Sequence, residues 1–500
     1  MKNIKKLLAT TVAGALIILL ANSCGEDFVT KEFTNGVTDE NFFKNESDAL
    51  QALTAVYDIV SASGLYLEAA EVLGDCPSDD ILELTGDNGD FGPHFKAASD
   101  FRFLPNNRFS MARWFDAYKG VFRANILLDR LPDIEMDQAI KNRIEGETKF
   151  LRALFYFNLV VTFGDVPFTT DVLTREEYNE LARTDRNIIY GQMEQDLRDA
   201  AGFLPEDASD PVGRATRGAA NGLLSRVYLY QSKWSEAANT AKSVMDQNTY
   251  QLVAGEDFHK LFSGQLENSS ESLFEMQSVS NAPNFWSGST ENHRSIHWSP
   301  VIGWANWFSP SPGAYDQFQA EPADVRRSGS ILHVGAVPTD MIDTDGDGVQ
   351  EPFPSGDMNS SYFHDNQCRK WLPEGQPMSS GNSFNVNFTI LRYAEVLLNY
   401  AEAQNELGNS TEALSAVNQI RSRAQVPDLT ETNQGLLRDL IRSERRKELL
   451  FEGQRYFDIQ RWGIAEQVLG PLGYETGRHE FWPVPVSELD LMPNLTQYPE

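Results

Sequence analysis

The sequence predicts a mostly α-helical fold in which tetratricopeptide-like helical pairs form a scaffold beside an irregular, loop-rich section. Apolar residues recur at three- and four-residue spacing over 47–60, 113–131 and 140–163, as one face of an amphipathic helix requires. Two later stretches each predict a pair of antiparallel helices. A central section shows no helical periodicity, and we expect it to form the irregular, loop-rich section.

The two helical pairs are expected at 217–247 and 390–424. Alanines stand at tetratricopeptide-like offsets in both pairs, with Ala237 and Ala241 in the first and Ala401 and Ala413 in the second. Small residues at these offsets let paired helices approach closely. The pairs are separated and degenerate, so we do not expect a regular open superhelix.

A further helix is expected at 434–452, ending at Gly453. Between about 271 and 387 the chain becomes rich in Gly, Pro, Ser, Asn and aromatic residues. This composition predicts irregular loops and short strands. Loops on a rigid scaffold commonly carry binding residues.

Residues 1–23 have the layout of a lipoprotein signal peptide. Three lysines precede an apolar stretch at 7–20 that is too short to span a bilayer, and small residues precede Cys24. We expect cleavage before Cys24 and acylation of that residue, which would anchor the protein to a membrane by lipid alone. The alternative is an ordinary secretory peptide with an incidental cysteine.

Charge and cysteine content limit the possible functions. The formal net charge is −30 at pH 7, so we expect no nucleic-acid partner and no attraction to anionic lipid. Neutral and cationic ligands are compatible with this negative charge. After Cys24 only Cys76 and Cys368 remain, which makes redox chemistry unexpected and leaves open either a disulfide or two small buried side chains.

Two long motifs resemble the SusD/RagB family of outer-membrane nutrient-binding lipoproteins. They are ILRYAEVLLNYAEAQNELG at 390–408 and LRDLIRSERRKELLFEGQRYFDIQRWG at 437–463, with supporting likeness at 150–167, 416–427 and 481–500. The likeness covers essentially the whole mature chain. It divides the chain into a helical region at 24–270, a loop-rich insertion at 271–387 and a helical region at 388–500, together forming one compact unit.

The resemblance implies a protein without enzymatic activity that captures oligosaccharides and passes them to a TonB-dependent, SusC-like outer-membrane barrel. It also implies that the lipid-anchored protein faces the cell exterior, because family members carry acidic residues just after the lipidated cysteine, as Glu26 and Asp27 stand here. A glycan hydrolase, a tetratricopeptide-type scaffold for protein partners, and a peptide or glycoprotein ligand are the alternatives.

The charged motif at 444–448 is expected to be structural. Glu444 and Glu448 lie one helical turn apart, and Arg455, Asp458 and Arg461 follow closely. Opposite charges at this spacing predict a local ion-pair network rather than a catalytic site. Arg392 and Glu395, in the other long motif, have the same interpretation.

The candidate ligand-binding residues are mainly aromatic. Trp286, Trp298, Trp304 and Trp307 fall close together in the central section, and their rings could stack on the C–H faces of sugars. The resemblance adds the loop after the first long helix, with Asp80 and Phe91. Individual tryptophans can instead fill the core, and acids in Gly-rich loops often cap turns.

A calcium site is the one metal site that we expect. Asp343, Asp345 and Asp347 alternate before Gly348, as in the first half of an EF-hand-type loop. Pro354 stands where a full EF-hand has its bidentate glutamate, so Glu351 would supply that carboxylate. A bare acidic turn is the alternative. No residue stands in a recognisable catalytic motif, and we assign no catalytic residue.

Overall fold

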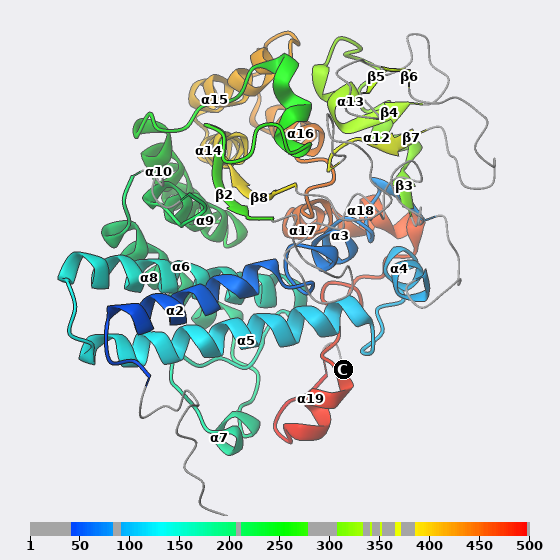
Figure 1. Cartoon of the computed structure of the whole chain (residues 1–500). Coiled ribbons are helices and arrows are strands. Elements are labelled where there is room, and N and C mark those ends of the chain that lie inside the picture. Colours follow the sequence, from blue (N-terminus) through cyan, green and yellow to red (C-terminus); the bar gives the residue numbers. More distant parts are fainter. Residues whose placement is uncertain are drawn as a thin grey trace, which may run out of the picture.

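The computed structural model describes residues 42–83, 92–206, 212–278, 308–333, 341–342, 351–352, 366–371 and 386–497. Most of this described chain is helical, as the sequence predicts. In Figure 1 the long helices of the first half lie side by side and the later helical pairs lie above them. Most of the small strands gather on one flank, and one strand pair lies in the middle beside the helical pairs.

Four long helices form the lower part of the molecule: α2 (Glu46–Tyr57), α5 (Arg108–Arg130), α6 (Gln138–Phe163) and α8 (Arg186–Phe203). Each begins after a residue whose side chain accepts hydrogen bonds from first-turn amides, namely Asn45, Asn107, Asp137 and Asp185. α6 packs against the other three. The first three helices confirm the predictions at 47–60, 113–131 and 140–163, whereas periodicity missed α8.

The two helical pairs are α9 (Arg217–Tyr230) with α10 (Trp234–Asp246), and α14 (Tyr393–Glu406) with α15 (Ser410–Arg423). They confirm the tetratricopeptide-like prediction. α10 packs against α14, so the pairs stack although many residues separate them in sequence. The alanines at the expected offsets are fully buried, and α16 (Gln434–Glu448) covers α14.

The central section contains short strands, as expected. All four described pairs are antiparallel: β1 (Ile81–Glu83) with β3 (Phe308–Pro310), β2 (Ser272–Met276) with β8 (Phe388–Arg392), β4 (Ile331–His333) with β7 (Asn366–Cys368), and β5 (Met341–Ile342) with β6 (Glu351–Pro352). The β2–β8 pair brings the beginning and end of this section together.

Shorter helices complete the described structure. They are α3 (Glu68–Gly74), α4 (Gly92–Ser99), α7 (Arg175–Asn179), α12 (Pro312–Asp316), α13 (Val325–Ser330), α17 (Arg455–Arg461), α18 (Ala465–Leu469) and α19 (Val486–Leu491), with 3-10 turns at Asp58–Ser61, Leu131–Asp133, Gly255–Phe262 and Gly470–Leu472. α3 lies against α17, at Gly74 and Gly453, where a Cβ on Gly74 would fall 2.0 Å from the Gly453 carbonyl oxygen.

The charged motif forms a buried ion-pair network, which confirms the structural interpretation. Arg392 binds Glu271, Glu448 and Glu452, and Glu448 also binds Arg423 and Arg326. Burial alone would raise the pKa of Glu448, but these three arginines hold it well below its usual value. The network therefore fixes β8 against α15 and α16.

A second part of the network joins α16 to α17. Arg445 donates to Asp458 (2.7 Å) and to the Asn399 side chain (2.9 Å), and Arg461 holds Glu402 with two hydrogen bonds of 2.6 and 2.8 Å. Paired, hydrogen-bonded charges are the form in which ions are tolerated in a protein interior.

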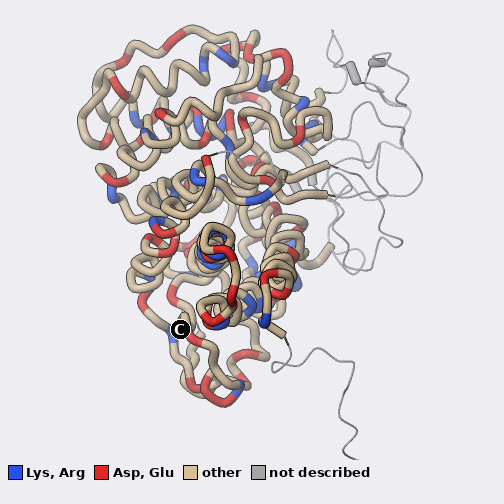
Figure 2. Tube along the Cα trace, turned by 60° about the vertical axis from the view of Figure 1, so that its left-hand side comes forward, with Lys and Arg blue, Asp and Glu red and all other residues tan. Residues whose placement is uncertain are grey.

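The structure also shows how the charges are distributed and whether the two cysteines are paired. Figure 2 shows acidic positions spread over the helices with basic positions among them. Cys76 and Cys368 are both buried and are not joined in a disulfide, so they act as small core side chains. Among the described residues, no helix is long and apolar enough to cross a membrane.

Candidate ligand-binding face

The β1–β3 pair joins two segments that the sequence marks as candidate ligand-binding segments. Its register pairs Ile81 with Pro310 and Glu83 with Phe308. The segment 84–91, which carries Phe91, follows Glu83 directly, and the segment 279–307, which carries the four candidate tryptophans, ends directly before Phe308. The described residues that border the two segments, Glu83 and Phe308, are therefore register partners.

Hydrogen bonds beyond the strands fix this pair in the fold. The Ser311 backbone N–H donates to the Asp80 carbonyl (2.8 Å), and the Ser311 hydroxyl donates to the Asp79 carbonyl (2.7 Å). The Ser309 hydroxyl donates to the carbonyl of Asn366 on β7 (2.7 Å). These bonds tie the loop after α3 to both β3 and β7.

Next to the strand pair, two aspartates and two arginines form a cluster that we call the Asp79–Arg446 cluster. Its members are Asp79, Asp80, Arg446 and Arg455. Arg455 binds both oxygens of Asp79 (2.8 and 3.0 Å), and Arg446 binds Oδ1 of Asp80 (2.8 and 2.6 Å). Burial raises the pKa of Asp80 although Arg446 opposes it. Burial would also raise the pKa of Asp79, but Arg455 and Arg446 lower it.

The structure places Asp80 inside this cluster, where the residue is 1% exposed. Its position is that of a residue that supports the strand pair. Direct ligand contact by Asp80 stays a prediction. The other candidates, Phe91, Trp286, Trp298, Trp304 and Trp307, lie outside the described residues.

A shallow groove of about 310 Å³ borders the cluster and includes side chains that the motif-based interpretation did not mark for binding. Arg446 and Arg455 line it together with Arg442 and Trp462. The Arg442 guanidinium lies 5.1 Å from the Trp462 ring centroid. Such aromatic and hydrogen-bonding groups can hold a polar ligand with an apolar face. The sequence signal that could have marked Trp462 for binding is its place in the RWG motif at 461–463.

Another aromatic pair lies on the same flank as the small strands (Figure 1). Tyr315 and His333 stack with ring centroids 4.5 Å apart, and Arg327 donates to the Tyr315 hydroxyl at 3.0 Å. His333 Nδ1 lies 2.8 Å from Asn366 Oδ1. Sequence reasoning also missed this pair, because its two rings are brought together only by packing of α12 on the strands.

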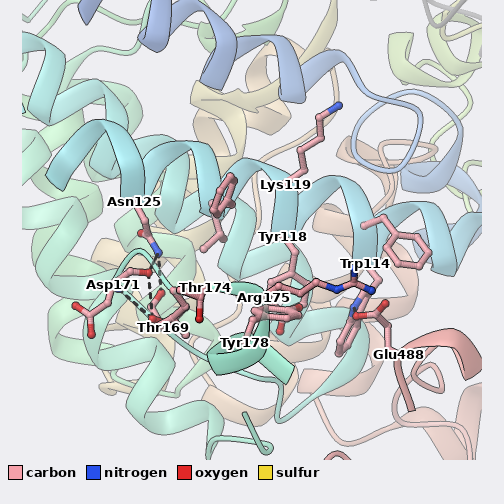
Figure 3. Close-up of a pocket in the computed structure, with 14 residues that line it drawn as sticks. Trp114, Tyr118, Lys119, Asn125, Thr169, Asp171, Thr174, Arg175, Tyr178 and Glu488 are labelled. Carbon is pink, nitrogen blue, oxygen red and sulfur yellow. Dashed lines mark hydrogen bonds between the residues drawn. The ribbon is translucent and has the colours of Figure 1, made fainter. Parts of the chain in front are cut away.

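A separate, mostly apolar pocket of about 470 Å³ lies between α5 and residues 169–178 (Figure 3). Tyr118 and Tyr178 line it, and the buried Trp114 donates from Nε1 to Glu488 Oε2 at 3.2 Å. Burial raises the pKa of Glu488. Phe115 and Phe122 are 42% and 51% exposed at this pocket. None of the candidate residues from the sequence belongs to it.

The lipid-anchor and calcium predictions fall largely outside the described residues. Cys24, Asp343, Asp345 and Asp347 are not among them, and of Glu351 only the backbone is described, in β6. β5 and β6 pair with Ile342 opposite Glu351, the two described residues that border the acidic segment 343–350. Within the described part of the chain, no cluster of His, Cys, Asp and Glu could hold a metal ion.

The described residues define a tetratricopeptide-like helical protein with short strand pairs on one flank. Comparison with known proteins identifies the class. The SusD family model matches residues 353–480, and a model described as "Starch-binding associating with outer membrane" matches 100–229. A solved "Laminarin binding SusD-like protein" is 30% identical, with a TM-score of 0.76 over 91% of this chain and 99% of that one. The chain belongs to the SusD family.

Curated relatives match this chain over 75% to 96% of its length. "SusD-like protein P2" of Formosa agariphila is 27% identical over 96% of this chain and 98% of its own. "Starch-binding protein SusD" of Bacteroides thetaiotaomicron is 22% identical over 75% of each chain. The predicted family and the predicted helical fold are thus both confirmed.

Proposed function

We propose that this protein is a surface glycan-binding protein that captures oligosaccharides without cleaving them. The observation that carries the proposal is the β1–β3 register, which pairs Glu83, the residue before the Phe91 segment, with Phe308, the residue after the tryptophan segment. Aromatic rings offer flat apolar faces for the C–H surfaces of pyranose rings, and neighbouring polar groups can hydrogen-bond the hydroxyls.

Glucans are the first ligand class to test. One relative is named for binding laminarin and another for binding starch, and both polysaccharides are glucans. Arg442 and Trp462 in the groove beside the Asp79–Arg446 cluster add polar and aromatic groups that suit an oligosaccharide.

Binding without turnover agrees with the state of the carboxylates in the strongest motifs. A general acid for glycoside hydrolysis needs a carboxyl that is protonated near neutral pH. Glu448, Glu395 and Asp458 instead have lowered pKa values, because arginines surround them and outweigh their burial. These groups hold the fold together.

The proposal places the protein at the outer-membrane surface, facing the exterior and anchored through a lipid on Cys24. The description of the matched family model, which refers to association with the outer membrane, supports this location. A SusC-like TonB-dependent barrel is the partner that would receive the captured glycan. Tethering both proteins in one membrane would raise their effective concentration for each other.

Calcium is proposed as a structural ion at Asp343, Asp345, Asp347 and Glu351. The β5–β6 pair supports it, because Ile342 and Glu351 are register partners and the segment between them carries alternating acids before Gly348. Carboxylates at alternate positions are a common source of calcium ligands. The ion would stiffen a loop and would take no part in chemistry.

The test uses protein beginning after Cys24 and a panel of laminarin, starch and unrelated polysaccharides in affinity gels, with calorimetry on oligosaccharides from the hits. We expect binding to at least one glycan and no new reducing ends. Release of reducing ends from a bound glycan would favour a hydrolase. Failure to bind any glycan, together with capture of a peptide or protein, would favour the alternative ligand or scaffold.

A further inference from the structure

A polar groove lies on another part of the surface and is larger than the apolar pocket at α5. It has a volume of about 610 Å³ and lies between the first turn of α8, the turn after α9, and α17. Tyr190, Tyr230, Gln460 and Phe481 line it. It contains no residue of the Asp79–Arg446 cluster, although α17 contributes Arg455 to that cluster and Gln460 to this groove.

Tyr190 is a buried side chain with an unused polar group at this groove. It is 6% exposed, and its hydroxyl makes no hydrogen bond with any described residue. Burial raises its pKa although Arg186 opposes the shift, so the hydroxyl stays protonated and can both donate and accept. Tyr230, which also lines the groove, likewise has no described hydrogen-bond partner for its hydroxyl.

Aromatic faces lie next to these hydroxyls. The exposed Arg186 guanidinium lies 5.2 Å from the Phe481 ring centroid and makes no ion pair with a described residue. Gly164 has a φ of +71°, and a Cβ there would lie 3.1 Å from the Phe481 ring. The absence of a side chain at Gly164 therefore lets the Phe481 ring pack close to the backbone at the groove.

The charges in the groove are nearly balanced. Lys233 is paired with Glu194 at 2.5 Å, and Arg461, whose side chain is 6% exposed, is paired with Glu402 and Asp458. Arg186 and Glu480 remain as one cation and one anion. A groove with donors, acceptors and ring faces but little net charge suits a neutral ligand that has many hydroxyls and apolar faces.

We propose that this groove is a second saccharide site, which binds a neutral sugar independently of the β1–β3 face. The choice of a sugar rests in part on the proposed function, but the place of the site does not. A protein with two such sites can hold a polysaccharide at two points, which raises the apparent affinity without a new contact at either site.

Hydrogen–deuterium exchange with laminari-, malto- and xylo-oligosaccharides locates the binding on the protein that begins after Cys24. We expect slower exchange in peptides covering 186–190, 229–233 and 478–482 with at least one of the three probes. Protection confined to 84–91 and 279–307 would overturn the second site and leave the proposed function intact. Protection confined to the groove would leave the groove as a saccharide site and overturn the β1–β3 face as the place of glycan binding. Absence of protection everywhere would overturn both the groove site and the proposed glycan binding.

Single-residue variants then show which side chains are responsible for the slower exchange on sugar binding. Tyr190→Phe removes only the hydroxyl, and we expect groove affinity to fall about three- to tenfold, as for loss of one hydrogen bond. Arg186→Ala should weaken the same protection. Arg130→Ala, an exposed arginine at the end of α5, and Ile188→Ala, 60% exposed on α8, are the matched controls. Equal protection in Tyr190→Phe, Arg186→Ala and the controls would overturn the assignment.

Discussion

Arg446 on α16 donates two hydrogen bonds to one carboxylate oxygen of Asp80, a residue 366 positions earlier in the chain. The same guanidinium lies 2.9 Å from Asp79 Oδ2. Ser311 binds the carbonyls of both aspartates. The C-terminal motif therefore supports the strand pair from which both candidate ligand-binding segments extend.

Loss of Arg446 should destabilise the protein strongly. Arg446→Gln leaves the buried Asp80 without its main cation, and we expect the free energy of unfolding to fall by about 3 kcal/mol. Urea denaturation measures the change. Arg438→Gln is the control, because the Arg438 pair with Glu406 is partly exposed and should be worth about 1 kcal/mol or less. Equal losses in the two variants would show that the Asp79–Arg446 cluster is not a special support.

Acid should destabilise the wild type partly through Glu448. Its folded-state pKa is lowered, so its stabilising contribution is present above the unfolded pKa of about 4.3 and is lost as pH falls through the folded value. Glu448→Gln should be less stable at pH 7 and should show a flatter decline in acid. Unfolding free energies measured between about pH 7 and pH 3 test this, and parallel curves for the two proteins would contradict it.

The candidate tryptophans should carry much of the glycan affinity. We expect at least one of Trp286→Ala, Trp298→Ala, Trp304→Ala and Trp307→Ala to weaken binding by about tenfold or more, as for an aromatic hot spot. Calorimetry measures the affinity. Phe122→Ala is the control, since Phe122 is an exposed ring at the separate pocket under α5. Full affinity in all four variants would reject the aromatic platform.

Calcium binding should depend on the acidic segment before β6. We expect calorimetry of the wild type to show binding of calcium, and Asp345→Asn to weaken it by about tenfold, because a carboxylate ligand becomes a neutral amide. Asp428→Asn, a change outside this segment, serves as the control. An absence of calcium binding by the wild type would remove the site.

The lipid anchor should depend on Cys24. We expect the wild-type precursor, expressed in a host with lipoprotein processing, to enter the detergent phase on Triton X-114 partitioning. Cys24→Ala should remain in the aqueous phase, because acyl chains supply the membrane affinity. Unchanged partitioning of the variant would show that the anchor lies elsewhere.

Local patterns in the sequence account for much of the fold. The periodicity of 140–163 predicts α6 because nearly one whole face of that helix is apolar, and the alanine offsets predict both helical pairs. α8 escaped the same reasoning, since its buried positions include Glu194 and Asp196 among the apolar residues. These two acids are accommodated by Arg152, Lys233 and other partners from distant elements, which periodicity cannot reveal.

The candidate site was predictable in residue type but not in arrangement. Composition pointed to the aromatic segment, and the resemblance pointed to the loop after α3. Neither showed that Glu83 and Phe308 are register partners, nor that Trp462 shares a groove with Arg446. Asp80 was marked for its loop position, whereas its burial depends on an arginine that arrives from α16.

The helical class, the family and the kinds of residue available for binding can be predicted from the sequence, because they depend on local spacing and on long motifs. The tertiary structure decided which charges neutralise one another, which strands bring distant segments together and where grooves remain open. The physical reason is that burial and pairing depend on neighbours in space. Arg446 and Asp80 satisfy each other only after the chain has brought α16 against the loop that follows α3.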